Sequence, residues 1–273
     1  MTIPRVCFVT SITGGYEKTC KKPAPQGIPC DFIVFTDAPK TIETHNGAWK
    51  VVDANLYEYG VDHALDASTN PREINSLWNN RHPFNRAKFF KLNLHRIPEL
   101  ASYDVVVWLD GTVEITDPMC AERVLGALGD SPLVFRHEFR KGSLKAEVDA
   151  SMYDKYTSAV WNGRQQPIQD IQKQYADYVR DGFKEKWIPS PIDEHDGVWI
   201  TCFVAWDMRS PRTKTFLDMW WRENVIHTTQ DQVSFPYVAW KTGIRPRSLP
   251  SGGIGGAEPH KKTDFYIKQD HGR

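Results

Sequence analysis

The sequence has no excess of charge, no long apolar run and few cysteines, and each shortage excludes a class of protein. Lys and Arg together number 34, as do Asp and Glu, so no overall field favours nucleic acid or an anionic membrane. No apolar stretch reaches the roughly 18 residues that a membrane-spanning helix needs. The N-terminus lacks the charged leader and apolar core of a secretory signal peptide. We therefore expect a cytoplasmic protein with no transmembrane segment and no nucleic-acid partner, in which an anionic ligand binds at a local site.

The five cysteines are odd in number and scattered, with no CxxC pair and no zinc-ligand spacing, so we expect reduced thiols in a reducing compartment. Several enzyme signatures are absent as well. The sequence has neither the GxGxxG spacing of a dinucleotide site nor the GK[ST] of a P-loop after its first apolar run. It has no GxSxG elbow and no HExxH zinc motif, which disfavours a lipid-directed hydrolase.

Short apolar runs alternate with helical patterns along the 273 residues, which is typical of an α/β protein. The apolar runs predict strands over residues 5–11, 31–35, 48–52, 105–109, 113–115, 132–135 and 198–206. Helical spacing predicts helices over residues 83–96, 143–161, 167–183, 212–226 and 230–243, and another that starts near 117. We expect one domain over residues 1–250, to which the later helices add a lobe, followed by a flexible tail or lid over residues 251–273.

The most informative stretch runs from Asp104 to Thr116. Its segment Val105–Leu109 is rich in β-branched residues and too short for an ordinary helix, which predicts a strand buried on both faces. The strand ends in Asp110, Gly111 and Thr112. Because strands of open α/β sheets present functional groups at their carboxyl ends, Asp110 is a candidate metal or phosphate ligand. The alternative is that Asp110 only caps a turn.

Two earlier strands also end in polar pairs. Thr10 and Ser11 close the first strand, and Thr36 and Asp37 follow the second. If these strands are parallel neighbours, the four side chains line one rim of the sheet.

The predicted helix over residues 83–96 places Lys88 and Lys91 on one face, and a charged helix face is commonly only solvated. This helix leads directly into the strand that precedes Asp110. Arg86 and Lys88 would therefore suit a diphosphate if they faced the same crevice.

Further candidates lie in the second half of the chain. Asp231 falls in the first turn of a predicted helix, where the helix dipole favours a carboxylate with or without a function. Glu147 would face either the site or solvent, and we expect solvent. Residues 136–140 and 188–197 are dense in titratable groups, and a glycine-rich hinge followed by His260, Lys261 and Lys262 would be able to close over an anion.

Six segments match one family in their order and spacing: VFTD, NRAKFFKL, YDVVVWLDGTVEI, FRHEFR, HDGVWITCFVAWD and TTQDQVSFPYVAWKTG. From about Val6 to Gly243 the chain resembles the TOD1/MUCI70 glycosyltransferase-like domain family, which has the GT-A fold of nucleotide-diphospho-sugar transferases. The resemblance implies a GT-A-like, Rossmann-related α/β architecture. Its mostly parallel central sheet would be flanked by helices, with an added helical lobe in the C-terminal half.

The resemblance also implies an activity and a set of site residues. A sugar would pass from a nucleotide-diphosphate donor to a hydroxyl of a glycan or lipid-linked glycan, in surface polysaccharide synthesis, with peripheral association with membrane machinery. The implied donor site comprises Thr10, Ser11, Thr36, Asp37, Arg86, Lys88, Asp110, Gly111, Thr112, His260 and Lys261. Asp231 is the first candidate for the carboxylate near the reacting sugar, with His137, Glu194 and His195 as further catalytic candidates. The acceptor-side candidates are Arg140, Asp196 and Gln232.

The implied cofactor is Mn²⁺ or Mg²⁺. Asp110 would occupy the first position of the DxD motif, with His260 as a second ligand, but Thr112 replaces the second acid. A hard cation accepts oxygens of the diphosphate and water for its other positions. The alternative is metal independence, with Arg86, Lys88, Lys261 or Lys262 neutralising the leaving group.

Two other classes remain open at this point. In a glycoside hydrolase, Asp110 and Asp231 would be the pair of carboxylates across the cleft. A carbohydrate-binding module would use the many aromatic side chains, but it would leave the polar strand ends unexplained. Binding of a nucleotide would indicate a glycosyltransferase, because neither a glycoside hydrolase nor a carbohydrate-binding module needs a nucleotide site.

Overall fold

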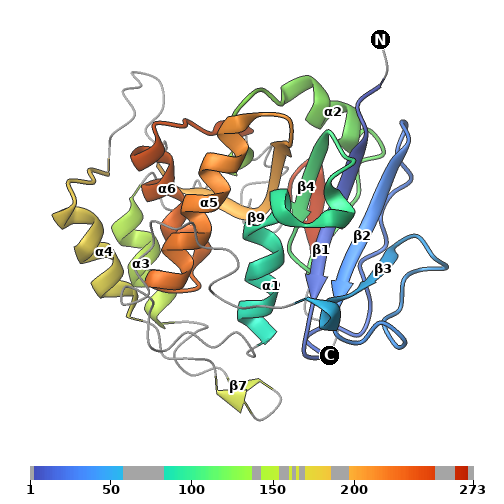
Figure 1. The fold of residues 1–273 in the computed structure, drawn as a ribbon, viewed down its shortest axis with the longest axis horizontal. Coiled ribbons are helices and arrows are strands. Elements are labelled where there is room, and N and C mark those ends of the chain that lie inside the picture. The colour runs from blue at the N-terminus through green and yellow to red at the C-terminus, as the bar shows by residue number, and fades with distance from the viewer. Residues whose placement is uncertain are drawn as a thin grey trace.

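The structure is a computed structural model that describes residues 3–57, 83–136, 143–153, 160–161, 164–165, 170–185, 197–249 and 262–269 (Figure 1). A seven-stranded sheet forms its centre, in the order β10-β6-β9-β4-β1-β2-β3. The strands are β1 Val6–Ile12, β2 Cys30–Thr36, β3 Lys50–Asp53, β4 Val105–Leu109, β6 Leu133–Arg136, β9 Trp199–Asp207 and β10 Arg247–Leu249. All neighbours pair in parallel except β9, which is antiparallel to both β4 and β6. The predicted mostly parallel sheet is confirmed.

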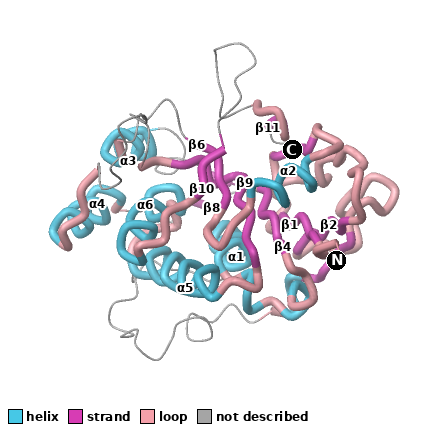
Figure 2. Tube along the Cα trace, turned by 90° about the horizontal axis from the view of Figure 1, so that it is seen from above, coloured by secondary structure: helices cyan, strands magenta, loops and turns pink. Residues whose placement is uncertain are grey.

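Helices cover both faces of this sheet (Figure 2). They are α1 Pro83–Leu92, α2 Cys120–Ala127, α3 Leu144–Tyr153, α4 Ile171–Arg180, α5 Pro211–Ile226 and α6 Asp231–Thr242. Apolar side chains of α1, α5 and α6 share one hydrophobic core with β1 and β4, while those of α2 belong to the core on the opposite face. Since β1 and β4 are buried along their whole length, their continuous apolar runs are explained by packing on both sides. This is the GT-A-like architecture that the resemblance implies, and α3 to α6 form its helical lobe.

Three helices are shorter than the sequence predicts. The helix expected over residues 167–183 spans Ile171–Arg180. The helix expected over residues 83–96 ends at Leu92, and residues 94–96 form a separate 3₁₀ turn ahead of Pro98. The helix expected over residues 143–161 ends at Tyr153, and residues 160–161 and 164–165 pair instead as the antiparallel strands β7 and β8. Helical periodicity alone does not locate such ends, because the turns that stop a helix depend on what the chain packs against next.

The strand β5 Val113–Ile115, predicted as an alternating strand after Asp110, pairs with the C-terminal strand β11 Tyr266–Lys268. Tyr266 is fully buried, and its ring stacks on Phe203 of β9 with 5.8 Å between centroids. Residues 262–269 therefore differ from the flexible segment expected there. Burial of Tyr266 attaches this part of the chain to the sheet.

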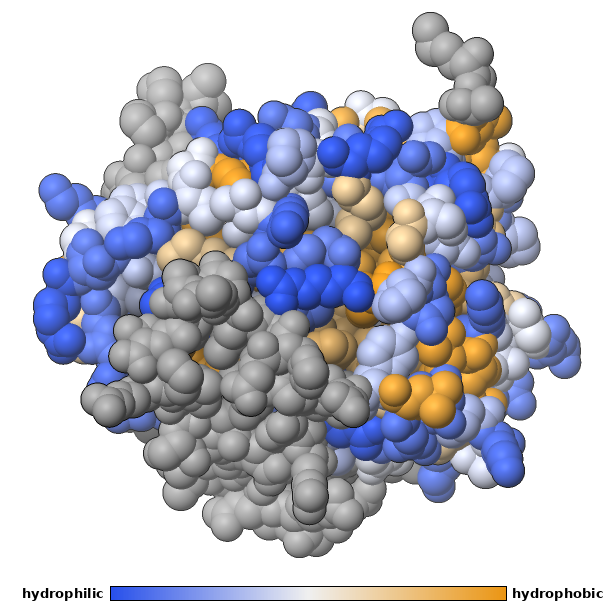
Figure 3. Space-filling model, in the orientation of Figure 1, coloured by the Kyte–Doolittle hydropathy of each residue, from blue (hydrophilic) through white to orange (hydrophobic). Residues whose placement is uncertain are grey.

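The face drawn in Figure 3 mixes hydrophilic and hydrophobic residues. Among the described residues, the large apolar side chains that are well exposed come from separate elements: Ile3, Leu56, Met119 and Val179. No described helix has both the length and the apolar character required to cross a membrane.

The helical lobe contains a buried pair of titratable side chains. Glu223 of α5 is almost fully buried, and its Oε2 lies 3.5 Å from Nε2 of His227. Burial raises the pKa of Glu223 to about 7, although Arg222 opposes the shift. Burial also lowers the pKa of His227 to about 4, against the attraction of Asp177. Burial therefore disfavours the charged form of both groups.

Removing the side chain of Tyr266 tests the attachment of β11. We expect Tyr266→Ala to lower the free energy of unfolding by about 3–5 kcal/mol, as for other buried aromatic truncations. Urea denaturation followed by tryptophan fluorescence measures this change. Lys262→Ala, at an exposed position of the same segment, is the control and should change stability by less than about 0.5 kcal/mol. A small effect of Tyr266→Ala would mean that the segment is not attached in solution.

The raised pKa of Glu223 predicts a pH dependence of stability. The folded protein holds this proton more tightly than the unfolded chain, so the stabilisation is complete below pH 4.5 and is lost as pH rises through about 7. The variant Glu223→Gln has no carboxyl group to ionise at this position, so it does not lose this stabilisation as pH rises. Its stability relative to the wild type should therefore increase with pH, by about 3 kcal/mol between pH 4.5 and 7.5.

His227→Gln is the counterpart, because the lowered pKa of His227 destabilises the folded protein as pH falls below 6.5. Its stability relative to the wild type should fall as pH rises from 4 to 6.5. Denaturation midpoints at five pH values measure both slopes. Two variants with the same pH dependence as the wild type would contradict the prediction.

Candidate active site at the carboxyl edge of the sheet

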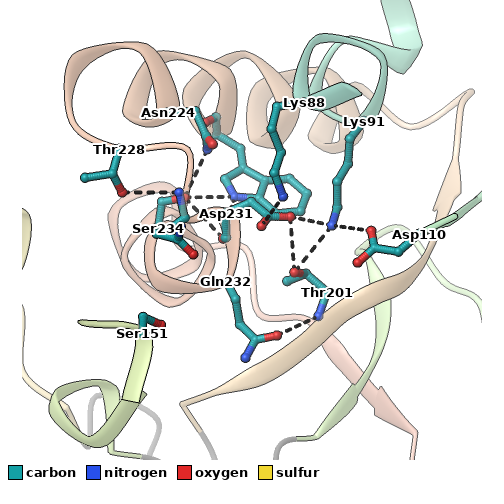
Figure 4. A network of polar contacts seen from close by, with 12 residues as sticks. Lys88, Lys91, Asp110, Ser151, Thr201, Asn224, Thr228, Asp231, Gln232 and Ser234 are labelled. Atoms are coloured by element: carbon teal, nitrogen blue, oxygen red, sulfur yellow. Dashed lines mark hydrogen bonds and ion pairs between the residues drawn. The ribbon is translucent and has the colours of Figure 1, made fainter. Parts of the chain in front are cut away.

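Four elements meet at the carboxyl ends of β1 and β4 and place polar side chains close together (Figure 4). Lys88 and Lys91 come from α1, Asp110 follows β4, and Asp231 opens α6. Thr201 joins them because β9 runs antiparallel to β4, so the start of β9 lies beside the end of β4. The backbone confirms this register, since N–H of Asp110 donates to the carbonyl of Cys202 at 2.8 Å.

The Lys91 ammonium group binds both carboxylates of the site. It lies 3.1 Å from Oδ1 of Asp110 and also forms an ion pair with Oδ2 of Asp231. Lys88 lies 2.6 Å from Oδ1 of Asp231, and the hydroxyl of Thr201 donates to Oδ2 of the same carboxylate at 3.2 Å. Only 1% of the Lys91 side chain is exposed, so water does not substitute for these partners. Two lysines and two aspartates thus form one connected network.

Two tryptophans bind the aspartates of the site, one through a carboxylate and the other through the backbone. The indole N–H of Trp108 donates to Oδ1 of Asp110 at 2.9 Å. The indole N–H of Trp220 donates at 3.0 Å both to the backbone carbonyl of Asp231 and to the hydroxyl of Ser234, one helical turn further. Oδ2 of Asp110 has no hydrogen-bond partner among the described residues, and 36% of this side chain is exposed. Asp110 is therefore the carboxylate that a ligand reaches most easily.

The charges of the network set its protonation states. Burial opposes ionisation of Asp231, but Lys88 and Lys91 outweigh it and hold the pKa of Asp231 well below its usual range. The pKa of Asp110 is lowered in the same way. Burial would also lower the pKa of Lys91, yet the two carboxylates raise it, whereas for Lys88 burial dominates and lowers the pKa. Both carboxylates are ionised at neutral pH.

The rim formed by β1 and β2 lies beside this network. Both oxygens of Asp37 accept from N–H of Gly14 at 2.8 Å, and Arg86 donates to Oδ2 of Asp37 at 3.2 Å. The hydroxyls of Thr10 and Ser11 are buried and have no hydrogen-bond partner among the described residues. Arg86 is thus bound to Asp37, the acidic residue that follows β2.

Gln232 connects the start of α6 to two other elements. Its Oε1 accepts from N–H of Thr201 at 3.3 Å, and its Nε2 donates to Oε1 of Glu147 at 2.8 Å. The expectation that Glu147 faces solvent is wrong: this residue is only 6% exposed, because α3 packs against α6. Glu147 is therefore a second buried carboxylate beside Asp231.

The structure brings together four of the residues predicted from the sequence, namely Lys88, Asp110, Asp231 and Gln232. Thr36 is buried, with its hydroxyl accepting from N–H of Ala38 at 3.1 Å, and Thr112 is buried behind Asp110. Close packing explains Gly111, where an added Cβ would lie 3.4 Å from Cγ1 of Ile12. The predicted residues His137, Arg140, Glu194, His195, Asp196, His260 and Lys261 lie outside the described part of the chain.

Lys91 is the residue of this site that the sequence analysis did not select. Its spacing from Lys88 was the available signal, since residues three apart share a helix face. Because Lys88 was already a candidate for the crevice, the same face pointed to Lys91.

The described residues do not form a site for Mn²⁺ or Mg²⁺. Such a cation needs several oxygen ligands, and no group of three or more His, Cys, Asp or Glu side chains suited to a metal occurs in the described part of the chain. The oxygens of Asp231 already accept from Lys88, Lys91 and Thr201. Oδ2 of Asp110 alone remains without a partner, and an ammonium group binds the other oxygen of that carboxylate.

The family of the chain follows from comparison with known proteins. The family model described as "TOD1/MUCI70, glycosyltransferase-like domain" matches residues 76–249, more than half of the chain, so the chain belongs to this family. This confirms the resemblance. No curated protein matches the chain.

Two solved structures of glycosyltransferases are similar to the chain at 10% sequence identity. The apo structure of the bifunctional glycosyltransferase WbbM has a TM-score of 0.46, and the match covers 90% of this chain and 39% of that one. The apo structure of mouse xyloside xylosyltransferase 1 has a TM-score of 0.48, with 90% of this chain and 84% of that one covered. The chain therefore spans less than half the length of WbbM.

Replacing Lys91 tests the network. Lys91→Met leaves the buried Asp231 and the partly exposed Asp110 with one ammonium group, and we expect a loss of about 3 kcal/mol in the free energy of unfolding at pH 7. Lys145→Met is the matched control, because Lys145 pairs with Asp149 on the exposed face of α3, and such pairs contribute less than about 1 kcal/mol. Guanidinium denaturation of both variants gives the comparison. Equal losses would mean that Lys91 is not a buried partner of both carboxylates.

Proposed function

We propose that this protein is a glycosyltransferase that moves a sugar from a nucleotide-diphosphate donor to a hydroxyl of a glycan or lipid-linked glycan. The observation behind this proposal is the network of Lys88 and Lys91 with Asp110 and Asp231 at the carboxyl edge of the sheet. Membership of a glycosyltransferase-like family supports it. We extend the proposal to the pathway: the transferred sugar would become part of a surface polysaccharide.

Sugar transfer requires that negative charge on the leaving diphosphate be stabilised. The bond between the anomeric carbon and the β-phosphate oxygen breaks, and its electron pair stays on the diphosphate. The side chain of Lys88 is 12% exposed, more than the 1% of Lys91, and it reaches the network from the same helix. Fixed cations in a site closed to bulk water stabilise such charge strongly.

The anomeric carbon becomes positively charged as the leaving group departs. Asp231 and Asp110 are ionised at neutral pH, so their charges are available to stabilise it without a change in protonation. The lowered pKa makes Asp231 a poor base. The proton of the acceptor hydroxyl therefore passes to a group on the acceptor side, for which the sequence nominates His137, Glu194 and His195.

The nucleoside part of the donor is assigned to the rim of β1 and β2. The buried hydroxyls of Thr10 and Ser11 have hydrogen-bonding capacity that the described residues leave unused. Buried polar groups without partners are costly, so a polar ligand that bonds to them would bind favourably. Gln232, which follows Asp231 and bridges Thr201 and Glu147, is assigned with Arg140 and Asp196 to the acceptor.

A glycoside hydrolase is disfavoured by the protonation states. Such an enzyme needs one carboxyl group with a raised pKa to donate a proton to the leaving oxygen. Here nearby lysines lower the pKa of both Asp110 and Asp231, so neither carries a proton at neutral pH.

The variant Asp231→Asn tests the proposed role of the carboxylate. We expect turnover with the donor to fall by at least about 100-fold, because a fixed charge beside the reacting carbon is removed. The dissociation constant of the nucleoside diphosphate should change by less than about threefold. Transfer from radiolabelled nucleotide sugars and isothermal titration calorimetry measure the two quantities.

Asp181→Asn is the matched control. Asp181 also pairs with a lysine, Lys241, but on the surface of the lobe, and this variant should retain full turnover. Thermal unfolding verifies that both variants fold. Unchanged turnover of Asp231→Asn would contradict the proposed role, and the absence of binding to UDP, GDP, CDP, dTDP and ADP would contradict the proposed function itself.

A further inference from the structure

Among the described residues around Asp110, positive charges outnumber negative ones. Lys88 and Lys91 balance Asp110 and Asp231 one for one, and Arg86 is paired with Asp37. A further lysine, Lys268, lies on β11 directly opposite Val113 of β5, three residues beyond Asp110. The positive charge of Lys268 helps to lower the pKa of Asp110. No described aspartate or glutamate forms an ion pair with Lys268. The described charges near Asp110 therefore sum to a cationic site.

β11 has a fixed place in this arrangement. N–H of Gln269 donates to the carbonyl of Thr112 at 2.8 Å, and the burial of Tyr266 attaches the strand to the core. The backbone of Lys268 is thus held beside the Asp110–Thr112 turn, although the residue lies far along the chain. A cation that comes from a strand is better positioned than one on an unattached tail.

A divalent cation and a diphosphate make opposite demands on these groups. A hard cation beside a diphosphate still needs carboxylate oxygens of the protein, but Thr112 stands where a second acid would be, and Lys91 binds the oxygen of Asp110 that faces the network. A diphosphate needs cations, which Lys88, Lys91 and Lys268 provide.

We propose that this protein binds the diphosphate of its donor without a divalent cation, because Lys88, Lys91 and Lys268 supply the neutralising charge. The inference rests on the proposed function, since it concerns how the same site holds a nucleoside diphosphate. It assigns a donor-binding role to Lys91 and Lys268, and it makes Asp110 a carboxylate that orients Lys91 through Oδ1.

The experiment compares binding with and without metal. UDP, GDP, CDP, dTDP and ADP are titrated into the protein by isothermal calorimetry in EDTA, in Mg²⁺ and in Mn²⁺. We expect one nucleotide to bind in EDTA with a dissociation constant within about threefold of its value with metal. Binding that requires metal would overturn the inference and leave the proposed function standing, whereas no binding under any condition would overturn both.

The variant Asp110→Asn distinguishes metal-free binding from metal-dependent binding, because the two predict opposite changes in nucleotide affinity. In the metal-free site this change removes a negative charge next to the diphosphate, so binding should be unchanged or up to about tenfold tighter. In a metal site the same change removes the principal ligand, and a loss of at least about tenfold would overturn the inference. Thermal unfolding confirms that the variant is folded.

Lys268→Gln is a second variant, at a position outside the buried network. We expect it to weaken nucleotide binding by about tenfold, equally in EDTA and in Mn²⁺. Lys173→Gln is the control, since Lys173 is exposed on α4 and pairs with Asp177, and it should change binding by less than about twofold. Equal affinities of the Lys268 variant and the wild type would overturn the role given to Lys268.

Discussion

The ion pairs of Lys91 determine how the central part of this protein is assembled. A buried ammonium group is costly unless it has charged partners, and Lys91 finds one at the end of β4 and the other at the start of α6. The three elements must therefore meet at one point on the sheet. The indole N–H of Trp108 binds the Asp110 carboxylate, and that of Trp220 binds the backbone carbonyl of Asp231, so the aromatic core and the polar site depend on each other.

The fold was largely predictable because its strands are short apolar runs that are buried on both faces. The stretch Val105–Leu109 is an example, since its length and its β-branched residues leave little room for a helix. Asp110 and Asp231 were also predictable from local rules, one as the polar residue after a buried strand and the other as the acid in the first turn of a helix. Each of these rules concerns only a few neighbouring residues.

The partners of charged side chains were not predictable in this way. Lys91 and Glu147 are buried, whereas a charged helix face is commonly solvated, and in both cases the reason is a partner on another element. Arg86 is bound by Asp37, which follows β2, and its place on the helix did not predict this contact. Likewise, the net charge of zero conceals a local excess of positive charge near Asp110. Periodicity and composition hold no information about contacts between distant parts of the chain.

The ion pair between Lys88 and Asp231 joins residues that are 143 positions apart. At the usual rates of about 5–20 residues per second, a ribosome needs about 7–30 s to travel between them. During that time β1 to β4 are already made, while the two lysines of α1 still lack Asp231 and must stay hydrated. The edge of β5 also waits for β11 until still later. Four strands of the sheet are therefore available before this network, which is among the last parts of the domain to form during translation.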